Sequence, residues 1–191
     1  MSFRLFGFVG ASALMLTALM GCASESAADD GLAADEDTVD DSEYQDALKT
    51  CSGALYYGSC KFLHDASKYS RKLPEGRILP YCSESSEGVD CEAIEEGVVA
   101  VPRNQFTGRA LCGRYVRIVY EGKTVYAKII EKSNTTSSWE LSSKVFDQFG
   151  APYKSGSYNY STKRITYGSG CLKGAKMTIM AKGFVPPVEE K

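Results

Sequence analysis

Glu131 and Glu140, near the middle of the chain, are the side chains best placed for acid–base chemistry. Cleaving a glycosidic bond needs an acid that protonates the leaving oxygen, and hydrolysis usually adds a second carboxylate as base or nucleophile. Glu131 is therefore a candidate catalytic acid, and Glu140 is a candidate partner carboxylate. Lys128 and Lys132 flank Glu131 and would lower the pKa of its carboxyl group, so a ligand-binding role and a structural role both stay open.

Trp139, the only tryptophan, directly precedes Glu140 in a stretch rich in serine and threonine. Nothing in that pattern would bury the ring, so we expect Trp139 to be exposed. An exposed aromatic face can stack on the apolar face of a sugar ring. Trp139 and Glu140 are therefore candidate polysaccharide-binding residues.

A predicted β-hairpin and a predicted helix position these side chains. Residues 114–120 and 124–130 are rich in β-branched and aromatic residues and are separated by a short connection that contains glycine, which predicts two paired strands. Glu131 directly follows the second strand. Residues 140–149 place their apolar side chains on one helical face. Glu140 would then lie in the first helical turn, where the helix dipole favours a negative charge.

The rest of the body is also rich in strand-like runs. They span residues 53–58, 97–102, 164–167 and 175–181. Residues 60–97 are irregular, and a structureless insertion of this length is unusual in a compact domain unless a cross-link fixes it. The pattern predicts one mainly β domain over residues 48–185 and a C-terminal tail over residues 186–191.

The N-terminus has the features of an export signal. Residues 1–21 carry one charge, Arg4, before an apolar run that is short for a membrane span, which predicts a signal peptide. The run ends in Leu-Met-Gly before Cys22 and resembles a bacterial lipobox, in which the cysteine becomes the lipidated first residue. We expect Cys22 to be the lipid anchor of an exported lipoprotein, with an ordinary signal peptide as the alternative. Ala23 and Ser24 resemble an outer-membrane sorting signal.

The cysteines support an exported chain. Without Cys22, six of the seven remain, an even set that predicts up to three disulfide bonds: Cys51, Cys60, Cys82, Cys91, Cys112 and Cys171. Their pairing stays open. A zinc site is the competing interpretation, but the chain has no Cys-x-x-Cys pair and one histidine, His64. We expect no metal and no cofactor.

Charge divides the chain into two parts. Residues 23–46 contain ten of the 24 acids and no lysine or arginine, so we expect residues 22–47 to form a disordered acidic tether. Residues 47–191 hold the other 14 acids and 21 of the 22 bases, a net charge of +7. Such a domain could be drawn to an anionic polymer, which for an exported bacterial protein means envelope material sooner than nucleic acid. A basic surface that only aids solubility is the alternative.

Several motifs follow one another in a specific order. They are Val99-Ala100-Val101, Cys112-Gly113, Gly122-Lys123-Thr124-Val125, and Leu141-Ser142 followed by Phe146. This order resembles the double-psi β-barrel superfamily, which includes rare lipoprotein A, expansins, barwin-like proteins and secreted bacterial papain inhibitors. The resemblance covers about residues 53–181. It implies a mainly β fold, namely a six-stranded double-psi β-barrel with one or two short helices and disulfide-stapled loops.

The resemblance also locates the candidate site. Glu131 occupies the position where rare lipoprotein A has an Asp, and Tyr57 would lie near the same groove, although core packing is the alternative for this ring. The histidine that follows the Ala-rich strand in rare lipoprotein A is missing, because residues 98–102 read Val-Val-Ala-Val-Pro. The one histidine of the chain, His64, lies on the wrong side of the first insertion to take the place of the missing histidine in sequence order.

Three functions remain in view. The first is an envelope lipoprotein that binds polysaccharide, with peptidoglycan as the expected polymer, with little or no catalysis. The second is a peptidoglycan lytic transglycosylase that uses Glu131 as its acid. The third is a protein-binding module such as a cysteine-protease inhibitor, with contacts from residues 60–91 and a tyrosine-rich loop. The expected location is a membrane, the outer one above all, facing the periplasm or the cell surface.

Overall fold

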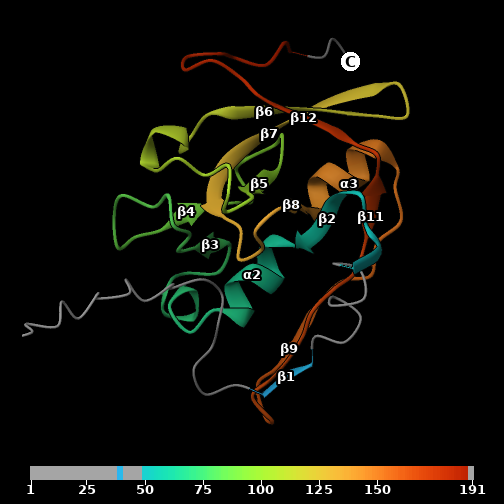
Figure 1. Cartoon of the computed structure of the whole chain (residues 1–191). Coiled ribbons are helices and arrows are strands. Elements are labelled where there is room, and N and C mark those ends of the chain that lie inside the picture. Colours follow the sequence, from blue (N-terminus) through green and yellow to red (C-terminus); the bar gives the residue numbers. More distant parts are fainter. Residues whose placement is uncertain (1–37, 41–48, 189–191) are drawn as a thin grey trace, which may run out of the picture.

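A mixed seven-stranded sheet forms the body of the protein, in a computed structural model that describes residues 38–40 and 49–188 (Figure 1). Its order is β11-β2-β8-β5-β7-β6-β12. The strands are β2 (Gly53–Gly58), β5 (Val98–Val101), β6 (Tyr115–Tyr120), β7 (Lys123–Lys132), β8 (Trp139–Ser142), β11 (Cys171–Lys173) and β12 (Lys176–Ile179). The prediction of a mainly β domain is confirmed.

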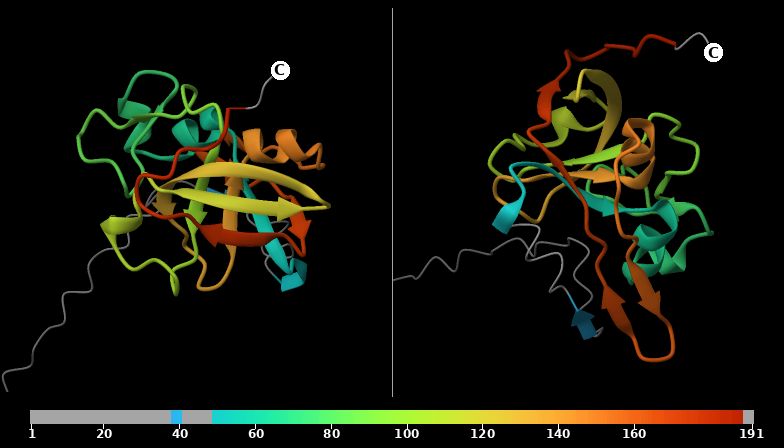
Figure 2. Two further views of the ribbon diagram at one scale, coloured as in Figure 1. Left: turned by 90° about the horizontal axis from the view of Figure 1, so that it is seen from above. Right: turned by 90° about the vertical axis from the view of Figure 1, so that its right-hand side faces the viewer.

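The sheet curls strongly because its two edge strands are neighbours in the chain. Only Gly174 and Ala175 separate β11 at one edge from β12 at the other (Figure 2). The pairs β2–β8 and β5–β7 are parallel, and the other neighbouring pairs are antiparallel. Within the described residues, strand pairing leaves this sheet open and does not close it into a barrel.

Two apolar clusters lie on the two sides of the central strands. Successive side chains of a strand point to opposite faces. On β5, Val99 and Val101 therefore join the larger cluster with Tyr56 and Phe146, whereas Val98 joins a smaller cluster with the insertion. Burial against both sides explains why β5 reads as an unbroken apolar run.

Two α-helices pack against this sheet. The helix α3 (Ser143–Phe149) ends at Gly150, which adopts a left-handed φ of 69°. The prediction that this helix begins at Glu140 is wrong, because Glu140 and Leu141 pair with β5 as part of β8. The sequence did not indicate the other helix, α2 (Cys60–Ala66), whose start Ser59 caps by accepting a hydrogen bond from the amide of Phe62 at 3.1 Å.

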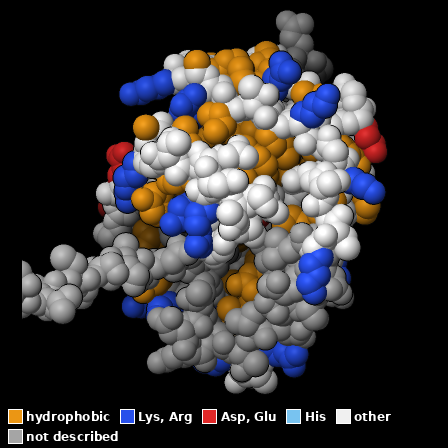
Figure 3. Space-filling model, in the orientation of Figure 1, with side chains coloured by type: hydrophobic (Ala, Val, Ile, Leu, Met, Phe, Trp, Pro, Cys, Tyr) orange, Lys and Arg blue, Asp and Glu red, His pale blue; other side chains and the backbone are white. Residues whose placement is uncertain are grey.

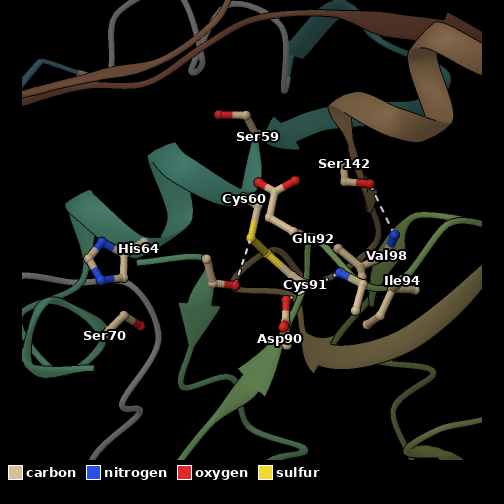
Figure 4. Close-up of a disulfide and its surroundings, with 12 residues drawn as sticks. Ser59, Cys60, His64, Ser70, Asp90, Cys91, Glu92, Ile94, Val98 and Ser142 are labelled. Atoms are coloured by element: carbon tan, nitrogen blue, oxygen red, sulfur yellow. Dashed lines mark hydrogen bonds between the residues drawn. A yellow bond between two sulfur atoms is a disulfide. The ribbon is translucent and has the colours of Figure 1, made fainter. Parts of the chain in front are cut away.

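The insertion between β2 and β5 is ordered by short elements and disulfides. It contains α2, the 3₁₀ turn η1 (Ser70–Lys72) and the two-residue strands β3 (Arg77–Ile78) and β4 (Val89–Asp90). The disulfide Cys60–Cys91 joins the start of α2 to the end of β4, beside the hydrogen bond from the amide of Val98 to Ser142 (Figure 4). The other pairs are Cys82–Cys112 and Cys51–Cys171, so the predicted framework of three disulfides is confirmed.

A second, smaller sheet projects away from the body. The hairpin of β9 (Ser157–Asn159) and β10 (Arg164–Thr166) extends beyond the main sheet, and β1 (Thr38–Asp40) pairs with β10 in parallel (Figure 2). These three residues fall within the predicted acidic tether. The predicted signal peptide, Cys22 and the rest of the tether lie outside the described residues.

In the part of the chain that the structure describes, no helix combines the length and the apolar character needed to cross a membrane.

Trp139 lies in the larger core, contrary to the expected exposure. Only 7 % of its surface is exposed, and it belongs to the same cluster as Val99 and Leu141. The ring is buried because β8 alternates: Trp139 and Leu141 face the core, and Glu140 faces the opposite side. Its predicted use as an exposed stacking surface does not fit this position.

Replacing Trp139 by alanine should therefore act on stability. We expect the free energy of unfolding to fall by about 3–5 kcal/mol, because a large core side chain is lost and a cavity remains. Urea unfolding measures this change. Tyr69→Ala, which removes an aromatic ring that is 39 % exposed, is the matched control and should cost far less. Equal stability of W139A and the wild type would contradict the burial of the ring.

Candidate functional site

Three neighbouring strands bring Glu131 and Glu140 onto one side of the sheet, on either side of Ala100. The central strand β5 pairs Ala100 with Glu131 of β7 on one side and with Glu140 of β8 on the other. Strands lie about 4.8 Å apart, so the two glutamate Cα atoms are roughly 10 Å apart.

An irregularity in β7 creates this arrangement. Val99 pairs with Ile129, but the next residue of β5, Ala100, pairs with Glu131, so Ile130 is an extra residue in the ladder. This is the pattern of a β-bulge, which re-aims the side chain that follows it. Ile129 packs in the larger core, whereas Ile130 packs in the smaller cluster under the insertion. Without the bulge, Ile130 would take the place of Glu131 opposite Ala100.

Backbone amides hold both carboxylate oxygens of Glu131. The amide of Tyr81 donates to Oε2 at 2.9 Å, and the amide of Lys132 donates to Oε1 at 2.8 Å. Burial raises the pKa of the Glu131 carboxyl group from 4.5 to about 7, although the two amide hydrogen bonds oppose the change. The charge of Glu140 adds a smaller increase, and that of Lys132 a smaller decrease. The carboxyl group of Glu131 thus exchanges its proton close to neutral pH instead of in the acidic range.

The segment around Tyr81 covers this acid and is fixed at its end. The amide of Cys82 donates to the carbonyl of Ile130 at 3.0 Å, one residue before Glu131. The disulfide Cys82–Cys112 then joins the segment to the residues that precede β6. The insertion is therefore held over the end of β7 by two hydrogen bonds from its amides, one to the Glu131 side chain and one to the Ile130 carbonyl, and is fixed beside them by one disulfide.

Glu131 and Tyr57 line one small recess, and Tyr57 also packs against the smaller apolar cluster. Its other lining residues come mainly from the insertion: Leu63, Ser67, Ser70, Ile78, Leu79 and Pro80, with Ile130 from β7. Its volume of ≈ 20 Å³ has room for one or two water molecules. A sugar ring does not fit inside it, so a glycan that approaches Glu131 would have to lie across the outside.

The remaining predicted site residues are placed apart from this recess. Glu140 is only 3 % exposed and points to the side of the sheet opposite Trp139. His64 lies in α2, where its Nδ1 faces Asp65 Oδ1 at 3.1 Å and its Nε2 faces the carbonyl of Leu73 at 3.2 Å. His64 is not among the lining residues, so it does not replace the missing histidine there.

Tyr81 was not predicted as a functional residue from the sequence. Its ring is 42 % exposed and packs edge-on against Phe106, with 5.2 Å between the ring centroids and an angle of 87°. Tyr81 and Phe106 come from different loops and meet beside Glu131 because Tyr81 is bonded to that acid through its amide. One local feature of the sequence bears on its position: Tyr81 directly precedes Cys82, and the disulfide Cys82–Cys112 fixes the backbone next to Tyr81.

No cluster of three or more His, Cys, Asp or Glu side chains that could hold a metal ion is found between residues 49 and 188 or at residues 38–40.

The raised pKa of Glu131 has a measurable consequence for stability. Because the folded pKa of about 7 lies above the ordinary value of 4.5, the folded protein keeps a proton that the unfolded chain releases between these pH values. The stabilisation that the protonated carboxyl group of Glu131 adds to the folded state is fully present below pH 4.5 and is lost as the pH rises through 7. We expect the free energy of unfolding of the wild type, minus that of E131Q, to fall by up to about 3 kcal/mol across this window.

Urea unfolding at several pH values checks this expectation. Glu84→Gln, at an exposed position of the same insertion, is the control and should give a difference from the wild type that stays flat over the same window. A flat difference for E131Q as well would contradict the burial of its carboxyl group.

Comparison with known proteins finds no relative of this chain. No family model matches the chain, and neither a curated protein nor a solved structure matches it. The chain's function is therefore argued from its own residues.

Proposed function

We propose that this chain is a cell-envelope lipoprotein that binds polysaccharide, with peptidoglycan as the expected polymer, and does so with little or no catalysis. In this proposal residues 1–21 are a signal peptide and Cys22 carries the lipid that holds the protein to a membrane. The domain then reaches the cell wall through the acidic segment. The basic balance of residues 47–191 supports attraction to an anionic wall polymer.

The finer fold assignment belongs to the same proposal. We infer a relation to the six-stranded double-psi β-barrel of rare lipoprotein A and expansins. The two parallel pairs within the sheet, β2–β8 and β5–β7, and the two-residue link between its edge strands support this inference. In that relation Glu131 occupies the position of the family's acid.

The observation that carries the binding proposal is the exposed ring of Tyr81, in the segment whose backbone contacts the partly buried side chain of Glu131. The amide of Tyr81 is bonded to Glu131, while its ring remains 42 % exposed beside Phe106. A sugar can place its apolar face on the Tyr81 ring and turn its hydroxyl groups toward the polar groups around that ring. The platform is rigid because the disulfide Cys82–Cys112 fixes it, so little conformational entropy is lost on binding.

Co-sedimentation of the full-length protein with purified sacculi tests this function. We expect the wild type to bind more strongly than a protein of matched charge, and Tyr81→Ala to weaken binding about tenfold, as the loss of a central aromatic anchor would. Tyr69→Ala removes an equally exposed ring elsewhere and should leave binding unchanged. Binding no stronger than that of the charge-matched protein would overturn the proposal.

A second function is favoured by one observation, the raised pKa of Glu131 beside a second carboxylate. An acid with a pKa of about 7 can donate a proton to a leaving oxygen at neutral pH, and Glu140 lies on the same side of the sheet. This is the chemistry of a lytic transglycosylase or a glycosidase. The small volume of the recess weighs against it, because a scissile bond would have to reach an acid that the Tyr81 segment covers.

Release of soluble muropeptides from sacculi separates the two functions. Binding alone predicts that the wild type and E131Q leave the sacculi equally intact. Catalysis would show as release that declines as the pH rises through 7, when Glu131 loses its proton, and that is absent in E131Q.

A further inference from the structure

Two cations converge on the exposed ring of Tyr81. The Arg109 guanidinium carbon lies 5.4 Å from the ring centroid, and Lys132 Nζ also lies 5.4 Å from it. With Phe106, these residues form what we call the Tyr81 cluster: Tyr81, Phe106, Arg109 and Lys132. Cations at such distances are attracted by the negative face of an aromatic ring.

The cluster is assembled from three separate parts of the chain. Tyr81 comes from the insertion, Phe106 and Arg109 come from the connection between β5 and β6, and Lys132 is the last residue of β7. Hydrogen bonds and a disulfide lock these parts together. Arg109 donates to the carbonyl of Ser83 at 3.3 Å, and Cys82, between Tyr81 and Ser83, is joined to Cys112.

The charge around this ring is biased toward positive. Glu131 is the acid in direct contact with the Tyr81 segment, and both of its oxygens are turned toward backbone amides. Its raised pKa means that part of its negative charge is absent at neutral pH. The two positive charges of Arg109 and Lys132 therefore outweigh the charge of Glu131 at this cluster.

Basic side chains are common on the surface as well. In the view of Figure 3, lysine and arginine side chains are spread over the visible face, and Asp and Glu are confined to its margins. A polymer that carries negative charge would thus meet a favourable field over a wider area than the cluster alone. The cluster adds what a diffuse charge cannot, which is an aromatic surface at a fixed distance from two cations.

We propose that the Tyr81 cluster is a subsite for an acidic sugar, one that carries a carboxylate. The sugar's apolar face would lie on the Tyr81 ring, and its carboxylate would pair with Arg109 and Lys132. A guanidinium group suits this role because it can donate two parallel hydrogen bonds to one carboxylate. This inference rests on the proposed polysaccharide binding and narrows it to acidic glycans.

Calorimetric titration of the full-length protein in detergent with oligosaccharides of equal length tests the subsite. The probes are oligogalacturonate, which is acidic, oligomers of N-acetylglucosamine, which are neutral, and oligomers of glucosamine, which are cationic. We expect the acidic oligomer to bind at least tenfold more tightly than the neutral one at low salt. Arg109→Gln and Lys132→Gln should each remove about threefold to tenfold of this preference, measured as the ratio of the two affinities.

A matched control separates the cluster from overall charge. Arg117→Gln removes one positive charge from an exposed position of β6 and should keep the preference for the acidic oligomer. Equal affinity for all three oligomers, insensitive to Arg109→Gln and Lys132→Gln, would overturn the acidic subsite while leaving polysaccharide binding in place. Tighter binding of an oligodeoxythymidylate than of oligogalacturonate would overturn it in favour of nucleic acid. Loss of all glycan binding, including to sacculi, would overturn the proposed function itself.

Discussion

The contact between the Tyr81 segment and the end of β7 sets the character of the whole site. The amides of Tyr81 and Cys82 bond to Glu131 and to the carbonyl of Ile130, and the disulfide Cys82–Cys112 makes this contact permanent in an oxidising compartment. One contact thus has two effects. It buries the carboxyl group of Glu131, which raises its pKa, and it holds the ring of Tyr81 at the surface beside that acid.

These effects explain why an acid position need not imply catalysis. Burial gives Glu131 the pKa that a general acid needs, but the segment that buries it also reduces the recess to ≈ 20 Å³. The binding surface that we propose is therefore the exposed Tyr81 ring outside the recess, and we expect the cations beside this ring to determine which polymers it favours.

Much of the fold follows from local sequence, but the site does not. The strand β2 keeps its predicted bounds. The strand β6 is one residue shorter at its start than predicted, and β5 and β7 differ from their predicted ranges by one or two residues at both ends, since alternation and β-branched residues specify them locally. The helix predicted from residue 140 begins only at Ser143, because residues 140–142 belong to β8. Pairing with β5 outweighed the helical spacing of Leu141 and the apolar residues that follow it. Seven residues were too few for α2 to show a periodicity.

The features that make the site are long-range and left no local pattern. The bulge at Ile130 depends on how β7 pairs with β5, and the position of Tyr81 over Glu131 joins residues 50 apart in the chain. Trp139 was expected at the surface because its neighbours are polar, yet strand alternation directs its ring into the core. The titration of Glu131 tests the central claim most directly. A ¹³C NMR measurement of its carboxyl carbon should give a midpoint near pH 7, and a midpoint near 4.5 would show that the Tyr81 segment does not bury this acid.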